Sequence, residues 1–341
     1  MQELTSCYKP LELFEAPIHE LFSAADELRR WKCGDTVTFV VERNINYTNV
    51  CVSKCKFCAF YARSEGEAFV LSKEEIVSRV AEAVARGATQ IMLQGGLNPE
   101  LGIEYFEDIF REIKSRFDVH LHSLSAPEIV FLAKREKMSI REVLSRLRDA
   151  GLDSLPGGGA EILADDVRRV ISPRKCSSEE WLRVMRIAHE LGLKSTATMM
   201  FGHVEDRKHV IEHLMKIRKL QEKTGGFTAF IPWTFEPGNS ELQVERASPV
   251  DYLKVVAISR ILLDNFRNIQ ASWLTQGIEV ATLSLLCGAN DLGGVMLEEN
   301  VVRATGKPVR FLSLEEIVGA AKSLGRPVAQ RDTYYRILRY F

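Results

Sequence analysis

The sequence predicts an α/β protein built on a (β/α)8 barrel of the TIM type, and three observations support this. Short apolar runs alternate about eight times with segments of helical periodicity between residues 36 and 295. Repeated βα units imply a parallel sheet with right-handed crossovers, and roughly 250 residues are typical of an eight-unit barrel. Polar or glycine-rich turns follow nearly every predicted strand, as expected where all strand ends share one functional face. An open, doubly wound sheet is the alternative.

The first half of the barrel follows from four strand-like runs and the helices between them. β-branched and apolar residues predict the first strand, and an apolar run that ends in Gly95-Gly96 predicts the second. Ser72, followed by acidic residues and by a glycine at the far end, predicts the helix between them. The predicted strands are 36–41, 91–96, 119–125 and 152–163, and the predicted helices are 72–87, 103–117 and 139–150.

The second half continues the same alternation. Helices are predicted at 179–191, 208–224 and 249–265, strands at 195–203, 227–233 and 269–273, and a last unit runs from 278 into the glycine-rich segment 287–294. Residues 1–35 are predicted as an N-terminal helical extension, 36–295 as the barrel, and 296–341 as a C-terminal helical segment packed on it.

Composition and charge exclude several classes of protein. The 341 residues include 45 basic and 46 acidic ones, for a formal net charge of -1, which gives no reason to expect nucleic acid as a partner. No apolar run approaches the roughly 20 residues that span a bilayer. The N-terminal residues are acidic and include an early proline, unlike a signal peptide. We therefore expect a cytoplasmic protein that binds neither nucleic acid nor membranes.

Three of the seven cysteines are clustered in the loop after the first predicted strand. Cys51, Cys55 and Cys58 have the spacing C-x3-C-x2-C. Three thiolates on one loop can hold three corners of an iron–sulfur cube, whereas full thiolate ligation needs a fourth cysteine. Because no fourth cysteine is nearby, one iron is expected to keep an open position. A structural zinc site completed by Cys33 or a histidine, or an electron-transfer cluster, remains an alternative.

The cysteine spacing, with Phe57 just before the last cysteine, resembles the signature of the radical S-adenosylmethionine (SAM) superfamily. Gly95 and Gly96 resemble the glycine-rich turn that receives the amino group of SAM there, and Phe57 is the aromatic that lies near the adenine. The resemblance implies a [4Fe–4S] cluster on the three cysteines and SAM as a second cofactor. Electron transfer into the sulfonium then releases a 5′-deoxyadenosyl radical.

A closer resemblance runs over nearly the whole chain. The sequence is similar to the cyclic dehypoxanthinyl futalosine synthases, radical SAM enzymes of menaquinone biosynthesis by the futalosine route. The segments that carry it are 44–60, 93–99, 151–163, 196–205, 225–233, 272–277, 288–294 and 330–335. Aminofutalosine synthases and FO synthase components are related alternatives, but Trp233 favours the cyclase because the relatives tend to carry leucine there. A non-enzymatic iron–sulfur or zinc scaffold is the alternative of another class.

The family implies the reaction. The radical takes hydrogen from the ribose C4′ of dehypoxanthine futalosine, and the resulting carbon radical adds to the benzoate ring of the same molecule. Loss of a proton and an electron then gives the cyclic product. The site must position a flexible substrate, exclude water and supply a proton acceptor. A ferredoxin or flavodoxin is expected as the electron donor.

Side chains at the predicted strand ends are the remaining candidate site residues. Glu161 is expected to bind ribose hydroxyls of SAM or substrate, although an acid favoured at a helix start is the alternative. Ser125 is a further candidate for cofactor binding. His203 and Glu205 are candidates for the proton acceptor or for SAM binding, with a purely structural histidine as the alternative. Asp291 is expected to receive substrate hydroxyls, with an Asx turn as the alternative.

Overall fold

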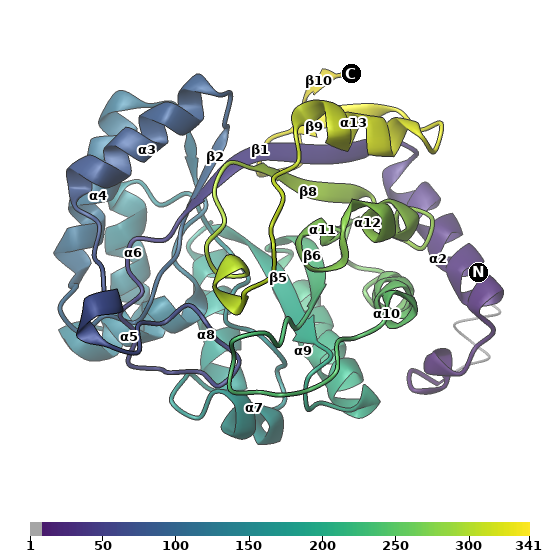
Figure 1. Cartoon of the computed structure of the whole chain (residues 1–341), viewed down its shortest axis with the longest axis horizontal. Coiled ribbons are helices and arrows are strands. Elements are labelled where there is room, and N and C mark those ends of the chain that lie inside the picture. Colours follow the sequence, from purple (N-terminus) through teal and green to yellow (C-terminus); the bar gives the residue numbers. More distant parts are fainter. Residues whose placement is uncertain (1–8) are drawn as a thin grey trace.

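A computed structural model describes residues 9–341 and shows the expected barrel of eight parallel strands (Figure 1). The strands are β1 (Val37–Ile45), β2 (Gln90–Leu93), β3 (His120–Leu121), β4 (Ser154–Leu155), β5 (Lys194–Phe201), β6 (Phe227–Thr234), β7 (Asn268–Ile269) and β8 (Asp291–Met296). β8, β1, β2 and β3 form one parallel sheet and β4 to β7 form another. Single parallel bridges, His122 to Ser154 and Gln270 to Asp291, join the two sheets into a ring.

Helices cover the outside of the barrel (Figure 1). They are α3 (Lys73–Ala85), α4 (Ile103–Arg116), α5 (Ala126–Glu136), α6 (Ile140–Ala150), α7 (Asp165–Ile171), α8 (Ser178–Glu190), α9 (Arg207–Thr224), α10 (Pro249–Leu262), α11 (Trp273–Gln276) and α12 (Ile278–Ser284). Ser72, Ser139 and Ser177 each start a helix through a capping box, in which serine and a glutamate three residues later satisfy free backbone N–H groups. Buried apolar side chains fill the space between strands and helices.

The N-terminal extension contains the short helix η1 (Glu12–Phe14) and the longer α2 (Ile18–Cys33), which packs against α10. The part of the predicted extension before residue 9 lies outside the described residues.

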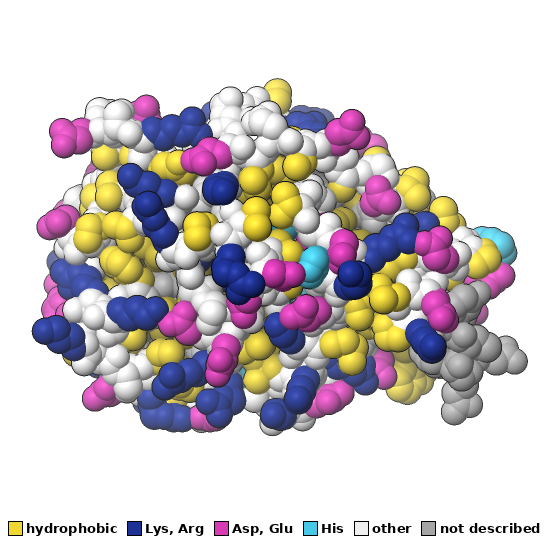
Figure 2. All heavy atoms as spheres, turned by 90° about the horizontal axis from the view of Figure 1, so that it is seen from below, with side chains coloured by type: hydrophobic (Ala, Val, Ile, Leu, Met, Phe, Trp, Pro, Cys, Tyr) yellow, Lys and Arg dark blue, Asp and Glu magenta, His cyan; other side chains and the backbone are white. Residues whose placement is uncertain are grey.

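No helix in residues 9–341 is long and apolar enough to cross a membrane. Basic and acidic side chains are interspersed on the face drawn in Figure 2.

The C-terminal segment differs from the purely helical one that the sequence predicts. After η3 (Arg303–Thr305) and α13 (Leu314–Lys322) come two strands, β9 (Val328–Arg331) and β10 (Ile337–Tyr340). β9 runs parallel to the start of β1, whereas β2 pairs with β1 only from Glu42 onward. The C-terminal hairpin therefore lies at the amino-terminal end of the barrel strands. Four-residue strands are too short for their periodicity to be recognised in a sequence.

The last barrel strand also differs from the prediction. Residues 278–284 form helix α12, and the second half of the glycine-rich segment 287–294, predicted to follow a strand, is itself part of strand β8. Gly293 and Gly294 lie inside this strand, where glycine usually marks a close approach. A Cβ on Gly294 would lie 2.2 Å from Oε1 of Glu42 on β1, so glycine here makes room for a buried glutamate.

Candidate active site

A cavity of about 240 Å³, here called the cysteine cavity, lies at the carboxyl ends of the first barrel strands. All eight residues that the sequence assigns to the cluster and to SAM line it. They are Cys51, Cys55, Cys58, Phe57, Gly95, Gly96, Ser125 and Glu161. The fold brings together residues from the loops after β1, β2, β3 and β4, as the barrel prediction requires.

The donor set of this cavity fits an iron–sulfur cluster with one open corner. Of the cysteines at positions 9–341, Cys33, Cys176 and Cys287 do not line it. Within the same residues, no three thiol, imidazole or carboxylate groups converge as ligands of a single metal ion would. Among the described residues, the cavity offers three thiols and no fourth cysteine, which is the donor set that an iron–sulfur cluster with one open corner requires.

Local contacts shape the cysteine loop. The amide of Cys58 donates to the carbonyl of Cys55 at 3.0 Å, and the Ser53 hydroxyl lies 3.2 Å from the Cys55 sulfur. Lys54 between them adopts a left-handed backbone conformation with φ of 44°. Burial raises the pKa of the Cys55 thiol to about 11, although the Lys175 ammonium and Ser53 act in the opposite direction. The free loop therefore holds this thiol protonated, and ligation of iron would displace the proton.

Gly95 and Gly96 lie directly against the cysteine loop. A Cβ on Gly96 would lie 2.1 Å from the carbonyl oxygen of Val50 and 2.9 Å from Cβ of Cys51. On Gly95 it would meet the ring of Tyr47 at 2.8 Å. Only glycine lets the loop after β2 approach this closely, which gives a physical reason for the Gly-Gly pair.

Glu128 holds this glycine loop in place. One carboxylate oxygen accepts from the amide of Gly95 at 3.1 Å and from the hydroxyl of Tyr47 at 2.7 Å. The other accepts from the amide and hydroxyl of Ser125, at 2.6 Å and 2.5 Å, in the capping box of α5. Burial raises the pKa of Glu128, while these four hydrogen bonds lower it. Ser125 thus borders the cavity as a helix cap.

Glu161 forms a buried ion pair at the wall of the cysteine cavity. Its carboxylate lies 2.5 Å from Nζ of Lys175, and both side chains are largely buried. Burial raises the pKa of Glu161, but the charges of Lys175 and Arg168 outweigh it and the pKa is lowered overall. The Lys175 ammonium also lies 5.2 Å from the centre of the Phe57 ring. The alternative of a simple helix-start acid does not account for these contacts.

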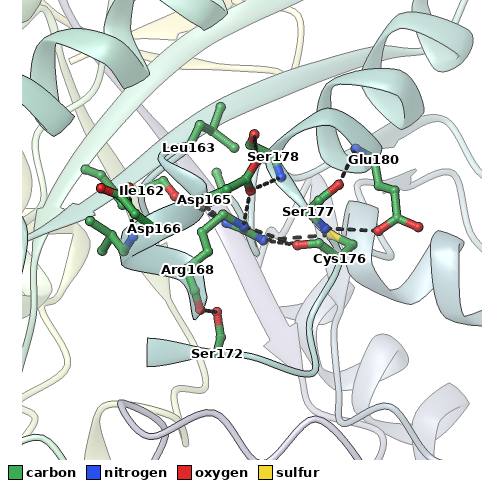
Figure 3. A network of polar contacts seen from close by, with 12 residues as sticks. Ile162, Leu163, Asp165, Asp166, Arg168, Ser172, Cys176, Ser177, Ser178 and Glu180 are labelled. Atoms are coloured by element: carbon green, nitrogen blue, oxygen red, sulfur yellow. Dashed lines mark hydrogen bonds and ion pairs between the residues drawn. The ribbon is translucent and has the colours of Figure 1, made fainter. Parts of the chain in front are cut away.

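Arg168 on α7 fixes the two loops that carry this ion pair (Figure 3). Its buried guanidinium donates to the carbonyls of Ala160 and Cys176, both at 2.5 Å, and reaches that of Ile162 at 3.4 Å. These bonds satisfy carbonyls of the segment around Glu161, whose own φ of 44° is unusual for a residue other than glycine.

A second cavity of about 230 Å³, the inner cavity, adjoins the first inside the barrel. The two share the lining residues Gln94, Gly158, Gly159, Glu161 and Trp233. Side chains that line only the inner cavity include Glu42, Gln90, His122, Arg331, Thr333 and Tyr335. The last three come from the C-terminal segment, in which the sequence predicted no site residue.

Two buried ionisable groups of the inner cavity have shifted pKa values. Burial raises the pKa of Glu42, against the opposing effects of Arg331 and Gln90. Burial lowers the pKa of His122 well below its usual range, so this imidazole is neutral at pH 7. Its Nδ1 lies 2.6 Å from the hydroxyl of Ser154. The inner cavity is therefore lined by a neutral imidazole and by a buried carboxyl group.

Comparisons with known sequences identify the family. The profile described as "Radical SAM superfamily" matches residues 45–217, which include the three clustered cysteines. The chain belongs to the radical SAM superfamily. A second profile, described as "CofH/MqnC C-terminal region", matches residues 224–339, which include the segment that lines the inner cavity.

Curated relatives of this radical SAM protein include proteins with two different names. A cyclic dehypoxanthine futalosine synthase from Streptomyces coelicolor is 47% identical over 96% of this chain and 84% of its own length. One from Halalkalibacterium halodurans is 42% identical over 99% and 93%. A 5-amino-6-(D-ribitylamino)uracil–L-tyrosine 4-hydroxyphenyl transferase from Methanocaldococcus jannaschii is also 42% identical, over 96% and 95%.

Solved radical SAM structures share the fold at lower identity. Methylornithine synthase matches with a TM-score of 0.75 at 19% identity, covering 95% of this chain and 96% of that one. The hydrogenase maturase HydG from Carboxydothermus hydrogenoformans matches with a TM-score of 0.75 at 19% identity, over 98% and 79%.

His203 and Glu205 lie apart from both cavities of the radical SAM site. They line a separate pocket between the loop after β5, α10 and the N-terminal residues around η1. Nδ1 of His203 lies 2.9 Å from the carboxylate of Glu205, which also accepts from the amides of Gly202 and His203. The contacts of this pair with each other and with their own loop account for their positions.

Asp291 is the first residue of β8. The sequence predicts a turn at this position, at the carboxyl end of a preceding strand. Its carboxylate is fully buried and accepts from Nε of Arg331 at 2.5 Å, from Nη2 of Arg331 at 3.0 Å and from the hydroxyl of Thr38 at 2.5 Å. Gly293 donates its amide as well, at 2.8 Å. The structure thus pairs Asp291 with the C-terminal segment.

Proposed function

We propose that this protein is a radical SAM cyclase that converts dehypoxanthine futalosine into its cyclic product. The observation that carries the proposal is the pair of adjoining cavities, one with three clustered cysteines and one of polar character inside the barrel. The identity to the Streptomyces coelicolor relative, over most of both chains, supports the choice of substrate.

In this proposal the cysteine cavity holds both cofactors. Cys51, Cys55 and Cys58 would hold the [4Fe–4S] cluster, and the Gly95-Gly96 loop would bring SAM against its open corner. With SAM, the cluster supplies the means to remove a hydrogen atom from an unactivated carbon. Glu161 and its partner Lys175 line the same wall and would hold polar groups of SAM or the substrate ribose through hydrogen bonds.

The inner cavity would hold the substrate. Trp233 borders both cavities, so its ring can pack against the aromatic half of a substrate whose ribose reaches toward SAM. Such a molecule is held in the folded shape that brings C4′ near the ring, which is a problem of positioning. His122, neutral and inside the cavity, is a candidate acceptor for the ring proton.

An acidic electron carrier such as a flavodoxin or ferredoxin would supply the electron. Lys54 and Lys56 are exposed and flank the buried Cys55, so two cationic side chains lie at the surface of the cysteine loop. A protein surface of opposite charge would be steered there.

The second candidate function is that of the archaeal relatives, since the Methanocaldococcus jannaschii transferase is as similar as the Halalkalibacterium halodurans synthase. Mass spectrometry separates the two. Anaerobically reconstituted protein would be given SAM and reductant, with either dehypoxanthine futalosine or tyrosine plus 5-amino-6-(D-ribitylamino)uracil.

The cyclase proposal predicts 5′-deoxyadenosine in that experiment, together with a product that lacks two hydrogens of dehypoxanthine futalosine. Tyrosine should stay unchanged. Transfer of the hydroxyphenyl group from tyrosine, with dehypoxanthine futalosine left intact, would assign the second function.

A further inference from the structure

The hydroxyl of Tyr335 is buried and has no hydrogen-bond partner among residues 9–341, and Tyr335 is one of the residues that line the inner cavity. A buried phenol oxygen without a partner loses the hydrogen bonds that it made to water, so such groups are rare in folded proteins. Because Tyr335 lines a cavity, a bound ligand would supply the hydrogen-bond partner that the protein does not.

The backbone of Tyr335 adopts a conformation that is unfavourable for a tyrosine. Its φ is 65°, in the left-handed region that residues other than glycine disfavour. The side chain of Asp332 stabilises the turn, since it accepts from the amides of Tyr334 at 2.8 Å and Arg336 at 2.9 Å. The amide of Tyr335 donates to the carbonyl of Asp332 at 3.2 Å. Strain that is held by dedicated contacts is typical of functional sites.

One cation and two carboxyl groups surround Tyr335. Arg331 is the one lysine or arginine among the lining residues of the inner cavity, and its guanidinium carbon lies 3.9 Å from the centre of the Tyr335 ring. Asp291 offsets the charge of Arg331, and Glu42 shares the cavity. A ligand carboxylate beside Tyr335 would therefore be bound by directed hydrogen bonds more than by net charge. The phenol hydroxyl of Tyr335 is able to donate one such hydrogen bond.

We propose that Tyr335 donates a hydrogen bond to the carboxylate of the benzoate group of the substrate and so fixes the aromatic half in the inner cavity. This inference rests on the proposed function. The opposite end of the inner cavity adjoins the cysteine cavity through Glu161 and Trp233. A substrate whose ribose points toward SAM therefore directs its other end toward Tyr335. The C-terminal hairpin is then part of the substrate site.

The chain offers a matched pair of variants. Tyr335→Phe removes only the buried hydroxyl, whereas Tyr334→Phe removes the hydroxyl of an exposed neighbour that reaches the carbonyl of Asp153 at 3.3 Å. For Tyr335→Phe we expect KM for dehypoxanthine futalosine to rise about 10- to 100-fold, the usual loss for a hydrogen bond to a charged group. Iron content and substrate-free SAM cleavage should not change. Tyr334→Phe should match the wild type in all three.

A substrate analogue with hydrogen in place of the carboxylate tests the partner of the phenol. Wild type should bind it about 10- to 100-fold more weakly than the substrate, and Tyr335→Phe should cause no further loss. Equal losses with substrate and analogue would overturn the assignment to the carboxylate. Wild-type kinetics in Tyr335→Phe would overturn the role of Tyr335 while the cyclase function stands. Wild-type protein that does not convert the substrate at all would overturn both.

Discussion

The ammonium of Lys175 lies 2.5 Å from the carboxylate of Glu161, and the pair joins two loops that border the cysteine cavity. Lys175 also faces the ring of Phe57, which precedes the last clustered cysteine. The Lys175 ammonium thus contacts both the loop after β4 and the cysteine loop. The conformation of each of these loops therefore depends on that of the other.

Lys175→Met should destabilise the fold, because it leaves Glu161 as a buried carboxylate without its partner. Removal of one member of a buried pair typically costs about 3–5 kcal/mol of unfolding free energy. Urea unfolding of proteins matched in iron content measures the loss. Lys54→Met, at an exposed position of the cysteine loop, is the control and should change stability little. Equal stability of both variants would contradict a structural role for the pair.

The same pair predicts the sign of a pH dependence. The pKa of Glu161 is lowered in the folded protein from a value near 4.5, so its ionised form stabilises the fold above that pH. This contribution is lost as the pH falls through the folded pKa. In Lys175→Met, burial is opposed by Arg168 without the larger contribution of Lys175, so the pKa of Glu161 should rise relative to wild type. The stability gap between wild type and variant should therefore be large at pH 7 and narrow below pH 4.5, and a constant gap would count against the ion pair.

Gly96→Ala should impair cofactor binding more than it impairs folding. The new Cβ would lie 2.1 Å from the Val50 carbonyl, so the cysteine loop would have to move. We expect a lower iron content after reconstitution and a SAM dissociation constant at least about 10-fold higher, as for a lost hydrogen bond to a charged group. Gly66→Ala is the control, since nothing lies within 4 Å of its Cβ. Normal iron and SAM binding in Gly96→Ala would show that the close approach is dispensable.

Glu128→Gln is compared with Glu142→Gln, because each of these glutamates belongs to the capping box of a helix. Glu128 accepts four hydrogen bonds inside the protein, including that of Gly95, whereas Glu142 caps α6 at the surface. An amide presents N–H groups where donors already point, so Glu128→Gln should cost about 2–4 kcal/mol and weaken SAM binding. Glu142→Gln should change stability little, because glutamine also serves at this position of a capping box. Calorimetry and SAM titration test the contrast, and similar effects in both variants would argue against the role of Glu128 in the glycine loop.

Substitutions of His122 and His203 compare the inner cavity with the separate pocket that follows β5. His122→Asn should lower cyclisation at least about 10-fold, because it removes an imidazole that borders the proposed substrate. His203→Ala should keep kcat within about 3-fold of wild type, because its pocket shares no lining residue with either cavity. The sequence makes His203 and Glu205 candidates for the proton acceptor. A large loss of kcat in His203→Ala would favour that hypothesis over His122.

The sequence predicted the barrel and the cysteine cavity because both rest on local patterns. Alternation of strands and helices specifies the order of elements, and parallel strands place Cys51, Gly95 and Glu161 at one end. Their common cavity follows from topology alone.

The inner cavity could not be predicted in this way. Tyr335 reaches it because β9 pairs with β1 across almost 300 residues of chain, a contact that leaves no short-range pattern. Asp291 was misplaced for a related reason. The glycines beside it suggested a turn, but Gly294 is a strand residue whose missing side chain accommodates Glu42.

The most direct test of the account is SAM cleavage by variants of the clustered cysteines. Wild type and Cys287→Ala, whose cysteine lies outside the cavity, should each hold about four irons after reconstitution and form 5′-deoxyadenosine with SAM and dithionite. Cys51→Ala, Cys55→Ala and Cys58→Ala should each lose the cluster and all 5′-deoxyadenosine formation. Cleavage of SAM that survives in any of these three variants would contradict the assignment of the cluster to these cysteines.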